Sequence, residues 1–200
     1  MGEKYVLIMN NMKKEIITIA GAPGSGKSST ADLVAGKLGF KRFSSGDFMR
    51  KISLKRGVSL NELSKIAEED TEIDRIIDAE VKTVGENEKI VVDSRLAFHF
   101  IPDSFKVFLD LPLEISKERI FDNLKINKLR QESEGSLNRE EIYRKIISRL
   151  ESERKRYREL YNIDHTDKRN FDLVIDTNKN NLNQVAEIIL REYKKWRREN

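Results

Sequence analysis

The sequence predicts an α/β protein in which helices cover both faces of a parallel sheet of about five strands. Two observations carry this prediction. Apolar runs rich in β-branched residues alternate with helical patterns, and that order is typical of a parallel sheet. A glycine-rich turn also joins the first apolar run to the first helical pattern. The 200 residues suit a single domain of this class that carries an insertion.

Five segments have the composition of strands. They are residues 16–20, 40–43, 90–93, 105–110 and 171–176. Helical spacing is found at residues 29–38, 113 to about 129, 138–160 and 181–198. Three further helical patterns lie within 46–84, opening near Asp47, Ser59 and Thr71. This stretch is longer than a plain strand-to-strand crossover needs, so it is predicted to be a helical insertion.

The glycine-rich turn matches the phosphate-binding P-loop pattern G-x-x-x-x-G-K-[ST]. Its glycines let backbone N–H groups approach a polyphosphate, and the next helix points its positive end at the same phosphates. Lys27 adds a charge for the outer phosphates, and the Ser28 hydroxyl can join a magnesium shell. A chance match is disfavoured because a strand precedes the turn and a helix follows it. The expected nucleotide contacts are Gly21, Ala22, Pro23, Gly24, Ser25, Gly26, Lys27, Ser28 and Ser29.

Composition narrows the other possibilities. The net charge is only +4, from 38 basic and 34 acidic residues, and no aromatic-studded basic patch argues for nucleic-acid binding. With no cysteine and two histidines, disulfides and thiolate or histidine metal sites are not expected. No apolar run approaches the ~20 residues of a membrane span. We expect a cytoplasmic protein, a monomer, with residues 1–13 as an extension.

Charged residues follow the predicted strands, where ligands of parallel sheets bind. Asp93 ends the third strand and is placed to hold magnesium through water, with Arg95 facing a phosphate. Asp47 opens the insertion, either as a helix cap or as a substrate contact. Arg50 lies one turn further and could fork onto an acceptor phosphate. The alternative for Asp93 and Arg95 is a strand-end cap with a surface arginine.

The helix 138–160 carries a line of polar residues beside an apolar stripe. Within that line, Arg149 and Arg156 are predicted to face a phosphate, and Arg154 flanks the other edge of the stripe. The alternative is a solvated face held by salt bridges.

Taken in order and spacing, these motifs resemble the archaeal type of cytidylate kinase, among the nucleoside monophosphate kinases. The resemblance covers residues 16–176. Its stretches are the P-loop, Ser45-Gly46-Asp47-Phe48-Met49-Arg50, Ser59-Leu60 through Ala67-Glu68-Glu69-Asp70 to Glu72-Ile73-Asp74, Val92-Asp93-Ser94-Arg95-Leu96-Ala97, Ser152-Glu153-Arg154-Lys155-Arg156-Tyr157, Tyr161-Asn162-Ile163-Asp164 and Phe171-Asp172-Leu173-Val174-Ile175. Two departures stand out. Ser94 replaces a glycine that is more usual there, and no motif fixes the contacts to the base.

The resemblance implies transfer of the γ-phosphoryl group of ATP to CMP or dCMP, with Mg²⁺. It makes 46–84 the monophosphate-binding insertion and about 126–160 the lid, on a core of residues 14–45, 86–125 and 165–200. The implied catalytic residues are Lys27, Arg50, Arg95, Arg149 and Arg156. The implied substrate contacts are Ser45, Asp47, Arg50, Asp93, Arg95, Arg154 and Asp167. Arg119 joins the ATP site, and Ser28 and Asp93 hold the metal.

The chemistry itself supports a kinase, because an ionised acceptor phosphate needs no general base and the chain places no histidine for one. The task is to bring two polyanions together, which positive charge and positioning accomplish. Other acceptors remain open: AMP, shikimate and dephospho-coenzyme A. A guanine-nucleotide switch is another reading, although Asn178-Lys179-Asn180-Asn181 lacks the aspartate it needs. An RNA-linked P-loop protein is a third.

Overall fold

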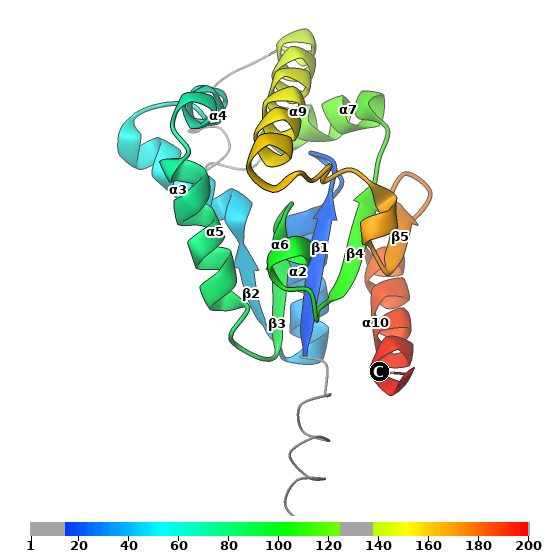
Figure 1. Cartoon of the computed structure of the whole chain (residues 1–200). Coiled ribbons are helices and arrows are strands. Elements are labelled where there is room, and N and C mark those ends of the chain that lie inside the picture. Colours follow the sequence, from blue (N-terminus) through cyan, green and yellow to red (C-terminus); the bar gives the residue numbers. More distant parts are fainter. Residues whose placement is uncertain (1–14, 125–137, 200) are drawn as a thin grey trace, which may run out of the picture.

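The computed structural model describes residues 15–124 and 138–199. Its centre is a parallel sheet with the strand order β2-β3-β1-β4-β5, which confirms the predicted fold class (Figure 1). The strands are β1 (Ile16–Gly21), β2 (Lys41–Ser44), β3 (Ile90–Asp93), β4 (Phe105–Asp110) and β5 (Leu173–Asp176). The helices are α2 (Lys27–Leu38), α3 (Ser45–Arg56), α4 (Leu60–Glu69), α5 (Glu72–Val84), α6 (Ala97–Phe100), α7 (Leu113–Leu124), α9 (Arg139–Tyr161), the 3₁₀ turn η1 (Lys168–Asn170) and α10 (Leu182–Glu199).

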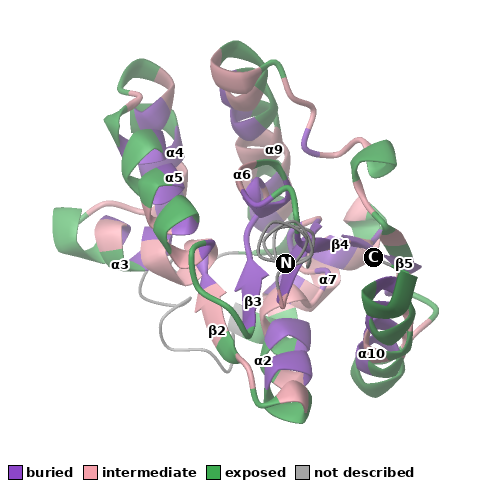
Figure 2. Cartoon of the chain, turned by 60° about the horizontal axis from the view of Figure 1, so that its bottom comes forward, coloured by how far each residue is buried: buried purple, intermediate pink, exposed green. Residues whose placement is uncertain are grey.

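The central strand β1 separates the two faces of the sheet. Successive side chains of a strand point to opposite faces, so Ile17 and Ile19 join one apolar cluster and Ile16 joins another. The first cluster packs the sheet against α2 and α10, and the second packs it against α3, α4, α5 and α6. All six residues of β1 are buried, as expected for a strand covered on both faces. The neighbouring strand β3 is buried along its whole length as well (Figure 2).

The predicted insertion consists of the three helices α3, α4 and α5 between β2 and β3. Ser59 and Glu62 form a complete capping box at the start of α4, and the Ser44 hydroxyl accepts from the Asp47 amide at the start of α3. These caps fix where each helix begins. Because α3 starts directly after β2, its first turn lies at the carboxyl edge of the sheet.

Helix α9 lies above that carboxyl edge, between α4 and α7 (Figure 1). Ile142 and Ile146 of α9 pack with Ile120 of α7 in a third, smaller apolar cluster. Further along, the buried residues Ser152 and Arg156 of α9 contact Ser64 and Asp74 of the insertion. The helix therefore connects the P-loop side of the molecule to the insertion.

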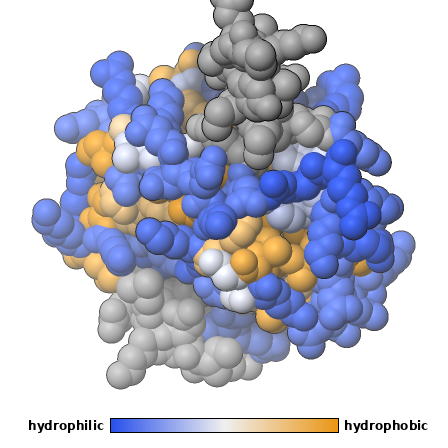
Figure 3. Space-filling view, turned by 90° about the horizontal axis from the view of Figure 1, so that it is seen from below, coloured by the Kyte–Doolittle hydropathy of each residue, from blue (hydrophilic) through white to orange (hydrophobic). Residues whose placement is uncertain are grey.

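Some expectations fall outside the described residues. These are the extension at 1–13, the part of the predicted lid before residue 138, and the predicted continuation of α7 beyond Leu124. In the described ranges 15–124 and 138–199, no helix has the length and apolarity to cross a membrane. The face below the strand starts is largely hydrophilic with smaller apolar areas, in keeping with the high charged content (Figure 3).

Two glycines, one in the P-loop and one in α2, test how the backbone conformation at each position affects stability. Gly21 has φ +144°, and a Cβ there would lie 2.3 Å from the Leu109 carbonyl oxygen. Gly36 lies inside α2 with nothing within 4 Å of an added Cβ. We expect Gly21→Ala to destabilise the fold by about 1–3 kcal/mol through backbone strain and collision. Gly36→Ala should stabilise it by about 0.5–1 kcal/mol through helix propensity. Urea unfolding of both variants measures the two changes in the free energy of unfolding, and equal changes would contradict the prediction.

Candidate active site

The P-loop holds its lysine by its own backbone. Lys27 Nζ donates to the carbonyl oxygens of Gly21 at 3.0 Å and Ala22 at 2.8 Å. Gly24 and Gly26 both have positive φ, which lets the loop wrap around the start of α2. From α7, the buried Ser116 hydroxyl donates to the Pro23 carbonyl oxygen at 2.5 Å. The loop is thus shaped in advance, with Lys27 at its mouth.

The carboxylate of Asp93 lies next to the P-loop serine. Ser28 Oγ donates to Asp93 Oδ2 at 2.6 Å, and Ser44 Oγ donates to the same oxygen at 3.1 Å. Asp93 is buried at the end of β3, and the Ser45 hydroxyl donates to its backbone carbonyl. A hydroxyl and a carboxylate are the hard oxygen ligands that Mg²⁺ prefers. Across the described part of the chain, no three His, Cys, Asp or Glu side chains group as a metal site. Ser28 and Asp93 together offer two such oxygen ligands, which fits a metal that also takes phosphate oxygens.

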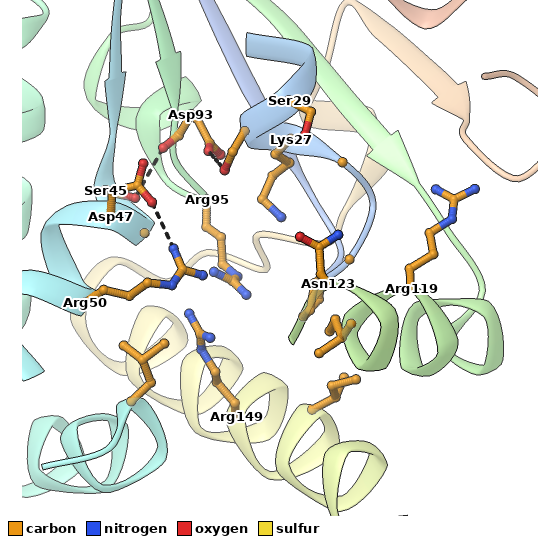
Figure 4. Close-up of a pocket in the computed structure, with 18 of the residues that line it drawn as sticks. Lys27, Ser29, Ser45, Asp47, Arg50, Asp93, Arg95, Arg119, Asn123 and Arg149 are labelled. Atoms are coloured by element: carbon orange, nitrogen blue, oxygen red, sulfur yellow. Dashed lines mark hydrogen bonds and ion pairs between the residues drawn. The ribbon is translucent and has the colours of Figure 1, made fainter. Parts of the chain in front are cut away.

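A cavity of about 300 Å³ extends from the P-loop to the insertion and to α9 (Figure 4). It is lined from six segments that are far apart in the sequence. Predicted site residues among its lining are Pro23, Gly24, Gly26, Lys27, Ser28, Ser29, Ser45, Asp47, Arg50, Asp93, Arg95, Arg119 and Arg149. The structure brings together most of the residues that the sequence indicated.

On the insertion side, Asp47 bridges two arginines. Its carboxylate oxygens lie 3.0 Å from Arg50 Nη1 and 3.0 Å from Arg42 Nη2. Arg42 also lies 3.6 Å from Asp93, and a Cβ on Gly46 would lie 3.4 Å from Arg50 Nη1. Asp47 is therefore an orienting partner of Arg50 as well as a residue of the helix start.

Arg95 and Arg149 approach the cavity from other directions, and with Arg50 they converge on one region near Lys27 (Figure 4). Arg95 follows β3 and Arg149 comes from α9. Both contact Glu153, a carboxylate that is 1% exposed. The pKa of Lys27 is lowered to about 7 by burial and by the nearby Arg95, with Arg149 acting in the same direction. The region is therefore strongly favourable to added negative charge.

Arg119 lies at the opposite end of the cavity, away from the converging arginines (Figure 4). Its Nη2 donates to the Thr177 carbonyl oxygen at 2.7 Å, and Nη1 lies 3.4 Å from the Thr177 hydroxyl. This fixes the guanidinium plane beside the P-loop, between α7 and the segment after β5.

Comparison with known proteins agrees with this geometry. Residues 16–179 match the model of the cytidylate kinase-like family. The chain belongs to the cytidylate kinase-like family. It is similar to cytidylate kinases from Archaeoglobus fulgidus, with 37% identity over 88% of this chain and 92% of the relative, and from Methanocaldococcus jannaschii, with 34% identity over 87% and 94%. The predicted family is confirmed.

Solved structures of more distant proteins share the fold of this cytidylate kinase-like chain. A shikimate kinase from Acinetobacter baumannii, in complex with shikimate, has a TM-score of 0.58 at 19% identity, covering 94% of this chain and 97% of its own. A gluconokinase from Sinorhizobium meliloti has a TM-score of 0.58 at 14% identity, covering 94% and 95%. At these identities the likeness concerns the fold alone.

Outside the P-loop, three of the predicted site residues of this cytidylate kinase-like chain do not line the cavity. Arg156 is 3% exposed and contacts Asp74 of α5 at 2.8 Å, so it ties α9 to the insertion. Arg154 pairs with Asp164 at 2.7 Å, and Asp167 pairs with Arg169. The prediction that these three residues face a substrate is not supported by their positions, because each side chain is committed to a partner elsewhere.

Three P-loop residues also lie behind the lining. Gly21 and Ala22 act through the carbonyl oxygens that hold Lys27, and Ser25 is buried within the loop. Their place in the sequence motif reflects the shape of the loop.

The sequence prediction missed several residues at the cavity, of which four polar ones bear on its chemistry. Arg42, Asn61 and Asn123 line the cavity, and Glu153 supports it from below the surface. Arg42 could have been found, because it precedes the turn that contains Ser45 and Asp47. Glu153 carried no usable signal, since a carboxylate on a charged helix normally faces solvent.

Proposed function

We propose that this protein is a nucleoside monophosphate kinase that transfers the γ-phosphoryl group of ATP to CMP. The observation that carries the proposal is the convergence of Arg50, Arg95 and Arg149, from three separate elements, opposite the P-loop lysine. On this proposal, Lys27 and Ser28 contact the phosphates of the nucleotide that is bound at the P-loop. The arginines are positioned for a second phosphorylated ligand. The cytidylate kinases to which the chain is similar support CMP as that ligand.

The proposed roles follow from position. ATP places its phosphates in the P-loop, with Arg119 beside the adenosine end. CMP lies between the insertion and α9, with its phosphate among the three arginines. An oxygen of that phosphate forms a bond to the γ-phosphorus while the bond from the γ-phosphorus to the bridging oxygen breaks, and ADP departs with the electron pair. The arginines and Lys27 stabilise the charge that develops on the transferred group.

Magnesium completes this proposal through two residues of the chain. Ser28 and Asp93 would hold Mg²⁺ together with phosphate oxygens, since both are oxygen ligands at the P-loop mouth. When bound, the ion neutralises charge on the phosphate oxygens of ATP. The insertion α3–α5 is proposed as the monophosphate-binding part, and the region that includes α9 as the lid. A monomeric state and a cytoplasmic location stay predictions from the sequence.

A panel of acceptors tests the proposal. ADP formation from ATP and Mg²⁺ is followed with CMP, dCMP, UMP, AMP and shikimate. We expect turnover with CMP or dCMP well above that with AMP or shikimate. Turnover with shikimate or AMP alone would reject the cytidylate assignment, and ATP binding with no acceptor-dependent turnover would reject a kinase.

The variant Arg50→Ala should raise the KM for CMP at an unchanged KM for ATP, with exposed Arg56→Ala as the control.

The lowered pKa of Lys27 predicts a pH dependence of ATP binding. Its pKa is about 7 without nucleotide, whereas bound phosphates favour the charged ammonium. ATP binding should therefore take up a proton between about pH 7.5 and 9, and the Kd should rise up to about tenfold per pH unit there. Calorimetry at pH 8 in two buffers of different ionisation enthalpy measures the uptake. Lys27→Arg keeps a permanent charge and should abolish it; an equal uptake in that variant would contradict the assignment.

A further inference from the structure

Glu153 is a buried carboxylate whose nearest partners are two arginines of the cavity. It lies on α9 with 1% of its surface exposed. Glu153 Oε2 lies 2.6 Å from Arg95 Nε in an ion pair, and its Oε1 accepts a hydrogen bond from Arg149 Nε at 3.2 Å. One carboxylate therefore spans two guanidinium groups that come from different parts of the chain.

The contacts use the same atom of each arginine. Both Arg95 and Arg149 make their shortest contact with Glu153 through Nε, and within residues 15–124 and 138–199 no hydrogen bond from their terminal Nη atoms to the protein is found. An arginine binds phosphate through a planar fork of N–H groups. Holding the inner nitrogen leaves the outer edge of each fork for a ligand. Both side chains line the cavity, where they point toward the region shared with Arg50 (Figure 4).

We propose that Glu153 is a positioning residue, which aims the forks of Arg95 and Arg149 at the acceptor phosphate. The inference rests on the proposed kinase function, because it assigns the phosphate that the forks meet. Without a fixed partner, two long like-charged side chains that lie close together would repel each other and sample other rotamers. The negative charge of Glu153 offsets one of the two positive charges, and its two contacts fix the direction of both arginine side chains.

The electrostatics of the site agree with a permanently charged Glu153. Burial acts to raise its pKa, but the surrounding basic side chains, Arg95 and Arg149 foremost, together hold the pKa below its ordinary value. Glu153 also counteracts the lowering of the Lys27 pKa. A second buried pair joins Arg156 of α9 to Asp74 of α5, and it lies outside the cavity. On this proposal, Glu153 makes positioning contacts with cavity arginines, whereas the contact of Arg156 with Asp74 is purely structural.

The test compares Glu153→Asp with Glu153→Gln, and uses Glu151→Gln, an exposed change on the same helix, as the control. Aspartate keeps the charge but is one methylene shorter, so it cannot reach both arginines as glutamate does. We expect Glu153→Asp to fold and to lose about 100-fold in kcat/KM for CMP, since a displacement of about 1 Å can cost that much. The KM for ATP should change less than about twofold. The side-chain Nε–H resonances of Arg95 and Arg149 in a ¹⁵N spectrum should move in the variant.

The outcomes are distinct. If Glu153→Asp keeps the kinetics and the arginine resonances of the parent, only the charge matters and the positioning role is overturned. If both variants alter only thermal stability, the pair is structural and the role is also overturned. If the unmutated protein phosphorylates another phosphorylated acceptor instead, the CMP assignment is refuted. The role of Glu153 is then still decided by the loss in kcat/KM of Glu153→Asp with that acceptor and by the arginine resonances. Should Glu153→Gln not fold, the aspartate variant decides alone.

Discussion

Replacing Lys27 with alanine is expected to lower CMP-dependent ADP formation by about 10³-fold or more, the scale reported for loss of one group that stabilises transition-state charge. Lys27 lies at the mouth of the P-loop, where the γ-phosphate would be transferred. No other described side chain contacts the same pair of loop carbonyls. Steady-state kinetics with CMP measures the change, and Lys37→Ala, an exposed change on the same helix, is the control.

The variant Lys27→Ala should be at least as stable toward unfolding as the unmutated protein. The pKa of Lys27 is lowered in the folded state, from 10.5 to about 7, so folding disfavours its charged form. A group of this kind weakens the folded state at pH 7, and that cost is relieved only as pH rises toward 10.5. Removing the ammonium should leave the free energy of unfolding unchanged or higher. A variant that lost activity because it unfolded would contradict the catalytic assignment.

Replacing Arg156 with alanine is expected to destabilise the protein by about 3–5 kcal/mol, because it leaves the buried carboxylate of Asp74 without its partner. The guanidinium of Arg156 also donates to the Ser64 carbonyl oxygen and to the Ser152 hydroxyl. Burial already raises the pKa of Asp74, against the pull of Arg156. Urea unfolding measures the loss.

The matched control for Arg156 is Arg158→Ala, two residues along α9. Arg158 has 65% of its side chain exposed and lies 3.7 Å from Asp164, so its removal should cost less than about 1 kcal/mol. The milder change Arg156→Lys separates stability from catalysis. If that variant folded with parental stability yet lost CMP turnover, Arg156 would return to the catalytic site where the sequence had suggested it.

The fold was predictable because its signals are local. The β-branched run before Gly21, the P-loop itself and the helical spacing after it lie within one short stretch of chain. The capping box at Ser59 fixed the start of α4 in the same way. The place of Arg50 and Arg95 in the cavity lining was predictable as well, since both follow strand ends at the edge where parallel sheets bind ligands.

The choice among the arginines of α9 was not predictable from spacing. Arg149 and Arg156 are seven residues apart and lie on nearly the same side of the helix. What separates them is the partner that each meets: Glu153 beside the cavity for Arg149, and Asp74 of α5 for Arg156. Asp74 is remote in the sequence, and its position depends on how three insertion helices pack. A single helix period contains no information on that packing.

The bridge from Asp47 to Arg42 and Arg50 has a consequence for competing salts. A chloride or a single carboxylate from solution must displace a tethered group that already occupies the guanidinium, and it gains little in exchange. A nucleotide phosphate brings several oxygens to neighbouring cations at once. Inhibition by simple monovalent anions should therefore be weak at moderate ionic strength, while polyvalent ions compete more effectively.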